Sequence, residues 1–126
     1  MADQAAEPLV LGRQGSFFVG GQVLDRGEGD TFNGDAAYVK FQGPPSPKTL
    51  PLIMWHGGGQ SGKTWETTPD GREGYQQIFV RRGYDVYLLD QARRGGASRS
   101  TVSDRDPYAG NNNSSYYNIF RLGTWT

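Results

Sequence analysis

The sequence of 126 residues contains no cysteine and only one histidine. Without cysteine the chain can form no disulfide framework, no thiolate metal site and no thiol nucleophile. A single histidine also excludes any metal site that depends on several imidazole ligands. From this composition we expect neither a cofactor nor a metal ion.

An excess of charge of one sign and long apolar runs are also missing. Thirteen Lys and Arg balance thirteen Asp and Glu, so no basic field is available to hold nucleic acid or anionic lipid. The longest apolar run, residues 50–55, is far shorter than the roughly 18 residues that a membrane span needs. The N-terminus shows no signal peptide, that is, no basic region followed by an apolar one. Nucleic acid and membranes are therefore not expected as partners.

Turn-forming and aromatic residues are abundant instead. The chain has 19 Gly and 7 Pro, with 3 Trp, 7 Tyr and 6 Phe to supply bulk to a small core. One domain is expected at this length. Residues 1–14 are polar and small, which indicates a loose lead-in with room for partial order. Residues 16–19, followed by a Gly-Gly turn, and the alternating segment 31–41 predict an antiparallel strand pair at a sheet edge.

The middle of the chain predicts a parallel unit. The apolar run 50–55 ends abruptly in a glycine-rich loop, as expected for a strand that is covered on both faces. Asp70 stands three residues before Glu73 in the manner of a capping box, and apolar residues at helical spacing then predict a helix over residues 70–82. A second apolar run, residues 86–89, follows this helix. Strand, helix and strand in this order form a βαβ unit, so we expect an α/β fold.

The glycine-rich loop allows two interpretations, of which the first is nucleotide binding. Residues 57–64, Gly-Gly-Gly-Gln-Ser-Gly-Lys-Thr, satisfy the P-loop pattern G-x-x-x-x-G-K-[ST]. A P-loop passes straight into a helix whose N-terminal amides face the phosphates. Pro69 and Gly71 argue against an unbroken helix from Gly62. Nucleotide binding is therefore the less favoured interpretation.

The second interpretation is an oxyanion hole. The four residues His56-Gly57-Gly58-Gly59 directly follow an apolar strand, and loops of this type supply oxyanion-hole amides in α/β-hydrolases. Glycines let backbone amides turn toward a developing alkoxide without obstruction by side chains. Residues 90–98 resemble the D-x-x-G-x-G-x-S turn that follows the fourth strand in that superfamily. The two motifs stand in the expected order, with the predicted helix between them.

Residues 15–21, 55–74 and 118–123 extend this likeness over nearly the whole chain, which resembles a branch of microbial carboxylesterases. The resemblance implies that Gly59 and Gln60 supply the oxyanion-hole amides, while His56, Gly57 and Gly58 shape the loop. The branch commonly has Cys at the position of Gly59, so this chain keeps the backbone donor but not the side chain. The resemblance further implies a small ester as substrate and a secreted or periplasmic location, and it leaves room for a homodimer.

The catalytic residues of such an enzyme are absent from the sequence. These enzymes use Ser, an acid and His in that chain order, with Ser on a G-x-S-x-G elbow. No G-x-S-x-G occurs here, and the only histidine, His56, belongs to the oxyanion loop. We therefore expect residues 15–126 to form the N-terminal portion of an α/β-hydrolase domain: antiparallel first strands, then a parallel βαβ unit with the oxyanion loop. This portion would belong to a serine-type carboxylic ester hydrolase, with the triad on the same precursor or on a second chain.

Less specific interpretations stand beside these. The chain is alternatively a noncatalytic interaction module on a partial hydrolase fold, and His56 then only hydrogen-bonds loop carbonyls. Lys63, Arg72 and Glu73 read as a solvated polar face. Residues 116–122 predict a short helix or turn near the C-terminus. Four arginines either bind an anionic partner or hold neighbouring carbonyls and carboxylates: Arg93, Arg94, Arg99 and Arg105.

Overall fold

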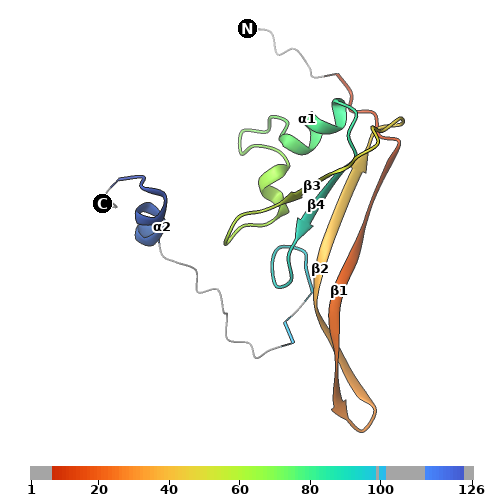
Figure 1. Ribbon diagram of the computed structural model, residues 1–126, viewed down its shortest axis with the longest axis vertical. Helices are drawn as coiled ribbons and strands as arrows, with labels where there is room; N and C mark the ends of the chain where they lie inside the picture. Colours follow the sequence, from red (N-terminus) through yellow and green to blue (C-terminus); the bar gives the residue numbers. More distant parts are fainter. Residues whose placement is uncertain (1–6, 99, 102–112, 124–126) are drawn as a thin grey trace.

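The computed structural model describes residues 7–98, 100–101 and 113–123 (Figure 1). Its elements are, in chain order, β1 (Arg13–Gly27), β2 (Asp30–Gly43), β3 (Leu52–Trp55), the 3₁₀ helix η1 (Gly62–Trp65), α1 (Tyr75–Arg81), β4 (Val86–Asp90) and α2 (Asn113–Phe120). The strands form one mixed sheet in the order β1-β2-β4-β3. β2 is antiparallel to both β1 and β4, whereas β3 is parallel to β4. The predicted antiparallel edge pair and the parallel β3–α1–β4 unit are confirmed.

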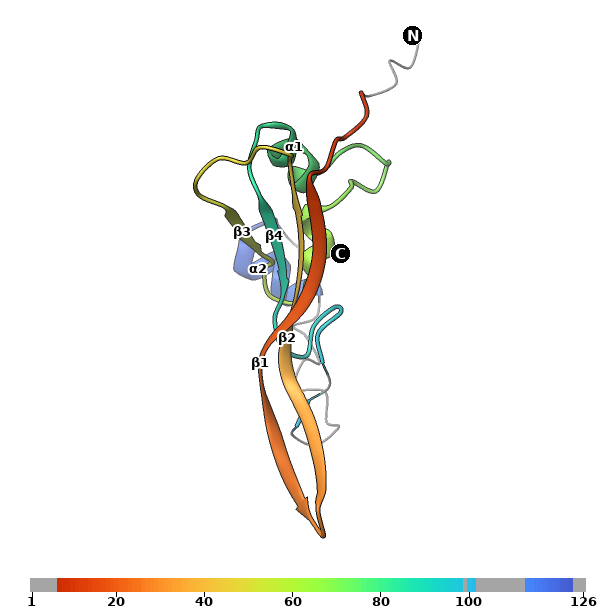
Figure 2. The ribbon, with the colours of Figure 1, turned by 90° about the vertical axis from the view of Figure 1, so that its right-hand side faces the viewer.

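β1 and β2 form one long hairpin that reaches well beyond the other strands (Figures 1 and 2). The turn predicted at Gly20-Gly21 is wrong, because β1 runs on through both residues and pairs with β2 on either side of them. Their φ angles of 70° and 100° are left-handed, so the glycine pair distorts the strand instead of ending it. The real turn is Glu28-Gly29, with φ angles of 54° and 81°. Two left-handed residues are what a two-residue hairpin turn of type I′ requires.

The lead-in that the sequence predicts to be loose is packed from residue 7 onward. Leu9 and Leu11 lie against the hydrophobic core. The Gly12 N–H donates to the Gly43 carbonyl at 2.9 Å, and Arg81 donates to the Pro8 carbonyl at 3.2 Å. The lead-in is thus partly ordered, since two leucines in an otherwise polar segment attach it to the core before β1 begins at Arg13.

The core lies on one face of the sheet. Val80 of α1 packs with Val86 and Leu88 of β4, and all three are at most 2% exposed. Met54 of β3 adds to this cluster from the neighbouring strand. Partly buried aromatic side chains surround it: Trp65, Phe79 and Tyr84. We call this the covered face, since η1 and α1 both pack on it.

The opposite face, which we call the open face, is also apolar. The strand register places on it Phe17, Val19, Val39, Phe41, Ile53, Trp55, Tyr87 and Leu89. At the β3 edge of this face Ile53 and Trp55 are 71% and 58% exposed, whereas Val39 in its middle is buried, at 5% exposure. The prediction that residues 50–55 form a strand covered on both faces is therefore wrong within the described part of the chain. Leu50 precedes β3 and is itself exposed.

The two helices begin at other residues than predicted. α1 begins at Tyr75 and not at Asp70, because Thr68 closes a tight turn: its carbonyl accepts the Gly71 N–H at 2.9 Å and its hydroxyl accepts the Arg72 N–H at 3.0 Å. The residue before the helix is Gly74, whose N–H donates to the Gln77 side-chain oxygen at 3.1 Å. A methyl group on Gly74 would overlap the Glu66 carbonyl oxygen. The C-terminal helix expected at 116–122 is α2, which ends two residues earlier.

Candidate active site

His56 fixes the start of the glycine loop against β4. The ring is buried, with Nδ1 2.8 Å from the Gly57 carbonyl oxygen. The Gln91 N–H approaches Nε2 at 3.4 Å and needs it unprotonated as an acceptor. We therefore assign the ring proton to Nδ1, which donates it to Gly57. With both ring nitrogens engaged, His56 joins the ends of β3 and β4 and is not placed to act as a general base.

The N–H groups of Gly59 and Gln60, the two predicted oxyanion donors, have different surroundings in this structure. The Gln60 N–H donates to the Gly57 carbonyl at 3.2 Å, and the Gly57 N–H donates to the Gln60 side-chain oxygen at 3.0 Å. These two bonds close a small turn whose third residue, Gly59, has a left-handed φ of 74°. Within the described residues, the N–H groups of Gly58 and Gly59 donate to no protein acceptor. The Gly59 amide is therefore available to a ligand, whereas the Gln60 amide is held in the turn.

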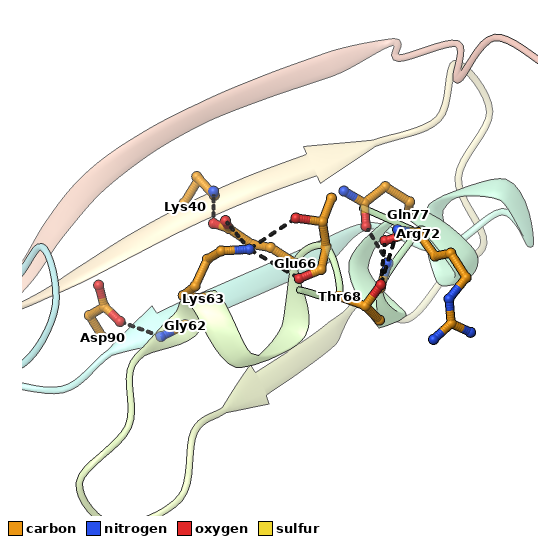
Figure 3. A network of polar contacts seen from close by, with 10 residues as sticks. Lys40, Gly62, Lys63, Glu66, Thr68, Arg72, Gln77 and Asp90 are labelled. Atoms are coloured by element: carbon orange, nitrogen blue, oxygen red, sulfur yellow. Dashed lines mark hydrogen bonds and ion pairs between the residues drawn. The ribbon is translucent and has the colours of Figure 1, made fainter. Parts of the chain in front are cut away.

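Asp90 holds the other end of the loop. Its Oδ1 accepts the Gly62 N–H at 2.5 Å, as Figure 3 shows, and its Oδ2 accepts the Gly96 N–H at 2.7 Å. A methyl group on Gly62 would lie 3.2 Å from Oδ1, and one on Gly95 would overlap the carboxylate. The two glycine motifs found in the sequence thus meet at one carboxylate. The sequence places Asp90 at the first position of the D-x-x-G-x-G-x-S turn but does not reveal this role.

The turn after β4 is attached to the long hairpin. The Ser98 hydroxyl oxygen accepts the Ala36 N–H at 2.6 Å, and the Ser98 N–H donates to the Ala36 carbonyl at 3.1 Å. Arg93 Nε pairs with Asp35 Oδ1 at 2.9 Å, and the Thr101 hydroxyl donates to the same carboxylate. Hydrogen bonds from Arg93 and then Thr101 lower the pKa of Asp35 to about 2. Hairpin, turn and loop therefore form one connected polar framework.

The sequence left open whether the arginines after β4 bind an anionic partner or hold neighbouring groups of this chain, and the framework answers this for Arg93. Arg93 holds a neighbouring carboxylate, which is the less specific of the two roles considered for it. Arg99 and Arg105 lie outside the described residues. Glu73, predicted to lie on a solvated face, pairs with Arg81 at 2.6 Å.

The geometry of residues 57–64 gives no support to phosphate binding. η1 is a four-residue 3₁₀ helix, and the next α-helix begins only at Tyr75. Lys63 Nζ donates to the Thr67 carbonyl and hydroxyl oxygens at 3.1 and 3.0 Å, so it is directed along η1 and not into the loop (Figure 3). A P-loop needs both the helix N-terminus and the free lysine.

A groove of about 830 Å³ runs beside η1 and α1. Gln60 and Ser61 reach it from the glycine loop, and Tyr75 and Ile78 line it from α1. Gly59 is not among its lining residues. Its volume falls within the range of small-molecule sites, which is roughly 300 to 1,000 Å³. The loop therefore borders a concave surface on the side of Gln60.

The described residues contain no group of three or more His, Asp or Glu side chains that could hold a metal ion. None of their helices is long and apolar enough to cross a membrane.

Comparison with known proteins places this geometry in context. No protein-family profile matches the chain. It is 40% identical over 80 residues to a probable secreted lipase, phiG, of a fungal species (strain ATCC 74256), a match that covers 63% of this chain. A solved structure described as a novel bacterial esterase superposes with a TM-score of 0.68 and 39% identity over 79% of this chain. The chain is related to α/β-hydrolase-like esterases.

The esterase-related chain is short beside its relatives. It spans 20% of the lipase and 34% of the bacterial esterase. Its mixed sheet is compatible with part of an esterase fold. The lipase is named as secreted, in line with the location that the sequence resemblance implies.

Proposed function

We propose that this chain supplies the oxyanion-hole segment of a serine-type carboxylic ester hydrolase. The observation that carries the proposal is the free N–H of Gly59, held at the end of β3 in a turn whose two ends are tied to β4. When a serine attacks an ester carbonyl, negative charge develops on the carbonyl oxygen, and N–H donors already in place stabilise it. The lipase and esterase relatives support ester hydrolysis in general.

The proposal assigns different parts to the two amides. Gly59 donates from the position it already has. Gln60 joins it when its N–H turns from the Gly57 carbonyl, a bond of 3.2 Å at the long end of the normal range. His56, Gly57 and Gly58 hold the loop in shape, and none of them exchanges protons with the substrate.

The remaining machinery comes from another stretch of polypeptide. We propose that Ser, acid and His lie on the same precursor or on a second chain, which corresponds to the part of the bacterial esterase that this chain does not match. That polypeptide would cover the open face, where Ile53 and Trp55 stand exposed. Secretion, a small ester as substrate and the possibility of homodimers belong to the same proposal.

A chimera tests the function directly. This chain replaces the matching third of the bacterial esterase, and we expect the product to hydrolyse p-nitrophenyl esters while the chain alone does not. Replacing the Gly59 N–H by an ester oxygen in the backbone should then lower turnover by roughly 10² to 10³. The Gln60→Pro variant removes the second amide and should act in the same direction.

The matched control is the same backbone replacement at Gly58, whose N–H is equally free but has no part in the proposed oxyanion hole, so turnover should stay near normal. A folded but inactive parental chimera would contradict the proposed function. Near-normal turnover after loss of both the Gly59 and the Gln60 amide would contradict the assignment of the donors.

A further inference from the structure

We infer that Asp90 is a positioning residue for the oxyanion loop. This inference rests on the proposed function and deepens it, since Asp90 itself touches no substrate. Its carboxylate accepts N–H groups from two separate loops, Gly62 at 2.5 Å and Gly96 at 2.7 Å. Asp90 therefore holds Gly62, the last residue of the oxyanion loop, in a fixed position relative to the turn after β4.

The loop between residues 56 and 62 is anchored at both ends to one place in the sheet. Its first residue, His56, meets the Gln91 N–H, and its last, Gly62, meets Asp90. Asp90 and Gln91 are neighbours at the end of β4. The residues between the two anchors include three glycines, which impose little rigidity of their own. The two anchors place the ends of the loop, and the Gly57–Gln60 turn between them then sets the direction of the Gly59 N–H.

The site is built for a carboxylate. Two oxygens are needed because two N–H groups arrive from different loops, and bonds to an ionised acceptor are stronger than neutral ones. A side chain at Gly95 would overlap the Asp90 carboxylate, and one at Gly62 would press against its Oδ1 at 3.2 Å. An asparagine in its place would keep one acceptor oxygen but turn an NH₂ group toward one of the glycine N–H groups.

The expected consequence for catalysis follows from preorganisation. Oxyanion donors act when they are already aimed at the position where charge develops. A donor displaced by about 1 Å can lose up to about 10²-fold in rate. Because the contact strengthens mainly in the transition state, its loss lowers kcat with little change in KM.

The first measurement is amide hydrogen exchange on the full 126-residue chain. In Asp90→Asn we expect the Gly62 and Gly96 amides to exchange roughly 10- to 100-fold faster, the factor that corresponds to a lost hydrogen bond to a charged acceptor. Asp25→Asn is the matched control, because Asp25 also accepts a glycine N–H, that of Gly27 at 2.8 Å, at the hairpin tip. Unchanged exchange at Gly62 and Gly96 in Asp90→Asn would overturn the inference.

The second measurement is steady-state kinetics in the active chimera. Asp90→Asn should lower kcat by up to about 10²-fold with KM unchanged, and Asp25→Asn should leave both constants as they are. A backbone ester at Gly62 removes only the N–H that Asp90 accepts, and should reproduce the loss of kcat if Asp90→Asn fails to fold. An unchanged kcat in an active chimera would overturn the inference, whereas an inactive parental chimera would overturn the proposed function and any catalytic role of Asp90 with it.

Discussion

The two faces of the sheet carry similar side chains but differ in how much of them is buried at β3 and β4. On the covered face, Val86 and Leu88 are nearly inaccessible beneath Val80 of α1. On the open face, Ile53 and Trp55 from the neighbouring strand stand mostly in solvent. Strands that are apolar on both faces are typical of parallel sheets with helices on both sides. The comparison indicates that β3 and β4 have the composition of a sheet with two covers, of which the described residues provide one.

The largest effect we expect is on stability, and it tests whether the two faces become equivalent. In the chimera, Leu88→Ala should lower the free energy of unfolding by about 2 to 5 kcal/mol, the usual cost of truncating a buried leucine. Ile53→Ala should cost a comparable amount there, because the added polypeptide buries the open face. Urea unfolding measures both values. A cost for Ile53→Ala within about 0.5 kcal/mol, as at an exposed site, would show that the open face stays uncovered.

The next effect concerns association of the chain by itself. The outer edge of β3 pairs with no other strand among the described residues. Exposed apolar side chains beside such an edge favour pairing and aggregation, so we expect the chain alone to associate in light scattering. Changing both Ile53 and Trp55 to Lys should shift it toward monomer. Val23→Lys is the control, because Val23 is 67% exposed on the hairpin beyond the open face. A monodisperse, cooperatively unfolding parental monomer would contradict this prediction.

The smallest expected effect is a change in how stability depends on pH, and it involves neither face of the sheet. The pKa of Asp35 falls from 3.8 to about 2 on folding because of its hydrogen bonds to Arg93 and Thr101. A carboxylate with a lowered pKa stabilises the folded state in full above its unfolded pKa, and this contribution is lost as the pH falls from about 4 toward 2. Urea unfolding of the chimera over this range should therefore show a weaker pH dependence in Asp35→Asn. An equal pH dependence in parent and variant would rule out the Asp35 attachment as its source.

The sequence predicts the strands of the parallel unit because apolar runs end at clear boundaries. Residues 86–89 and most of 50–55 became β4 and β3, and the loop between β3 and η1 lies where its motif placed it. The predicted positions of the hairpin turn and of the start of α1 were wrong for a shared reason. Gly20-Gly21 and Asp70 are strong local signals, yet β2 pairing and the Thr68 turn decided the backbone there. A local signal fails where another group, on a different strand as in β2 or close by as Thr68, already satisfies the backbone.

The central contact of the site was beyond the reach of sequence reasoning. The bond between Asp90 and Gly62 joins residues 28 positions apart, and only the pairing of β3 with β4 brings them together. The D-x-x-G-x-G-x-S turn and the glycine loop were both recognised, but nothing in either motif shows that one carboxylate serves both. The exposure of the open face could not be predicted either, because the composition of a strand does not show whether another segment packs on it.

The close passage of Gly74 over the Glu66 carbonyl sets a limit on how this chain can vary through evolution. Any side chain at position 74 would push α1 off the covered face, because the atom it would strike belongs to the backbone and cannot rotate away. Gly71, three residues earlier, faces open space and needs only a left-handed backbone, which asparagine can also adopt. In a library of all single substitutions, position 74 should accept glycine alone, while position 71 retains a second choice.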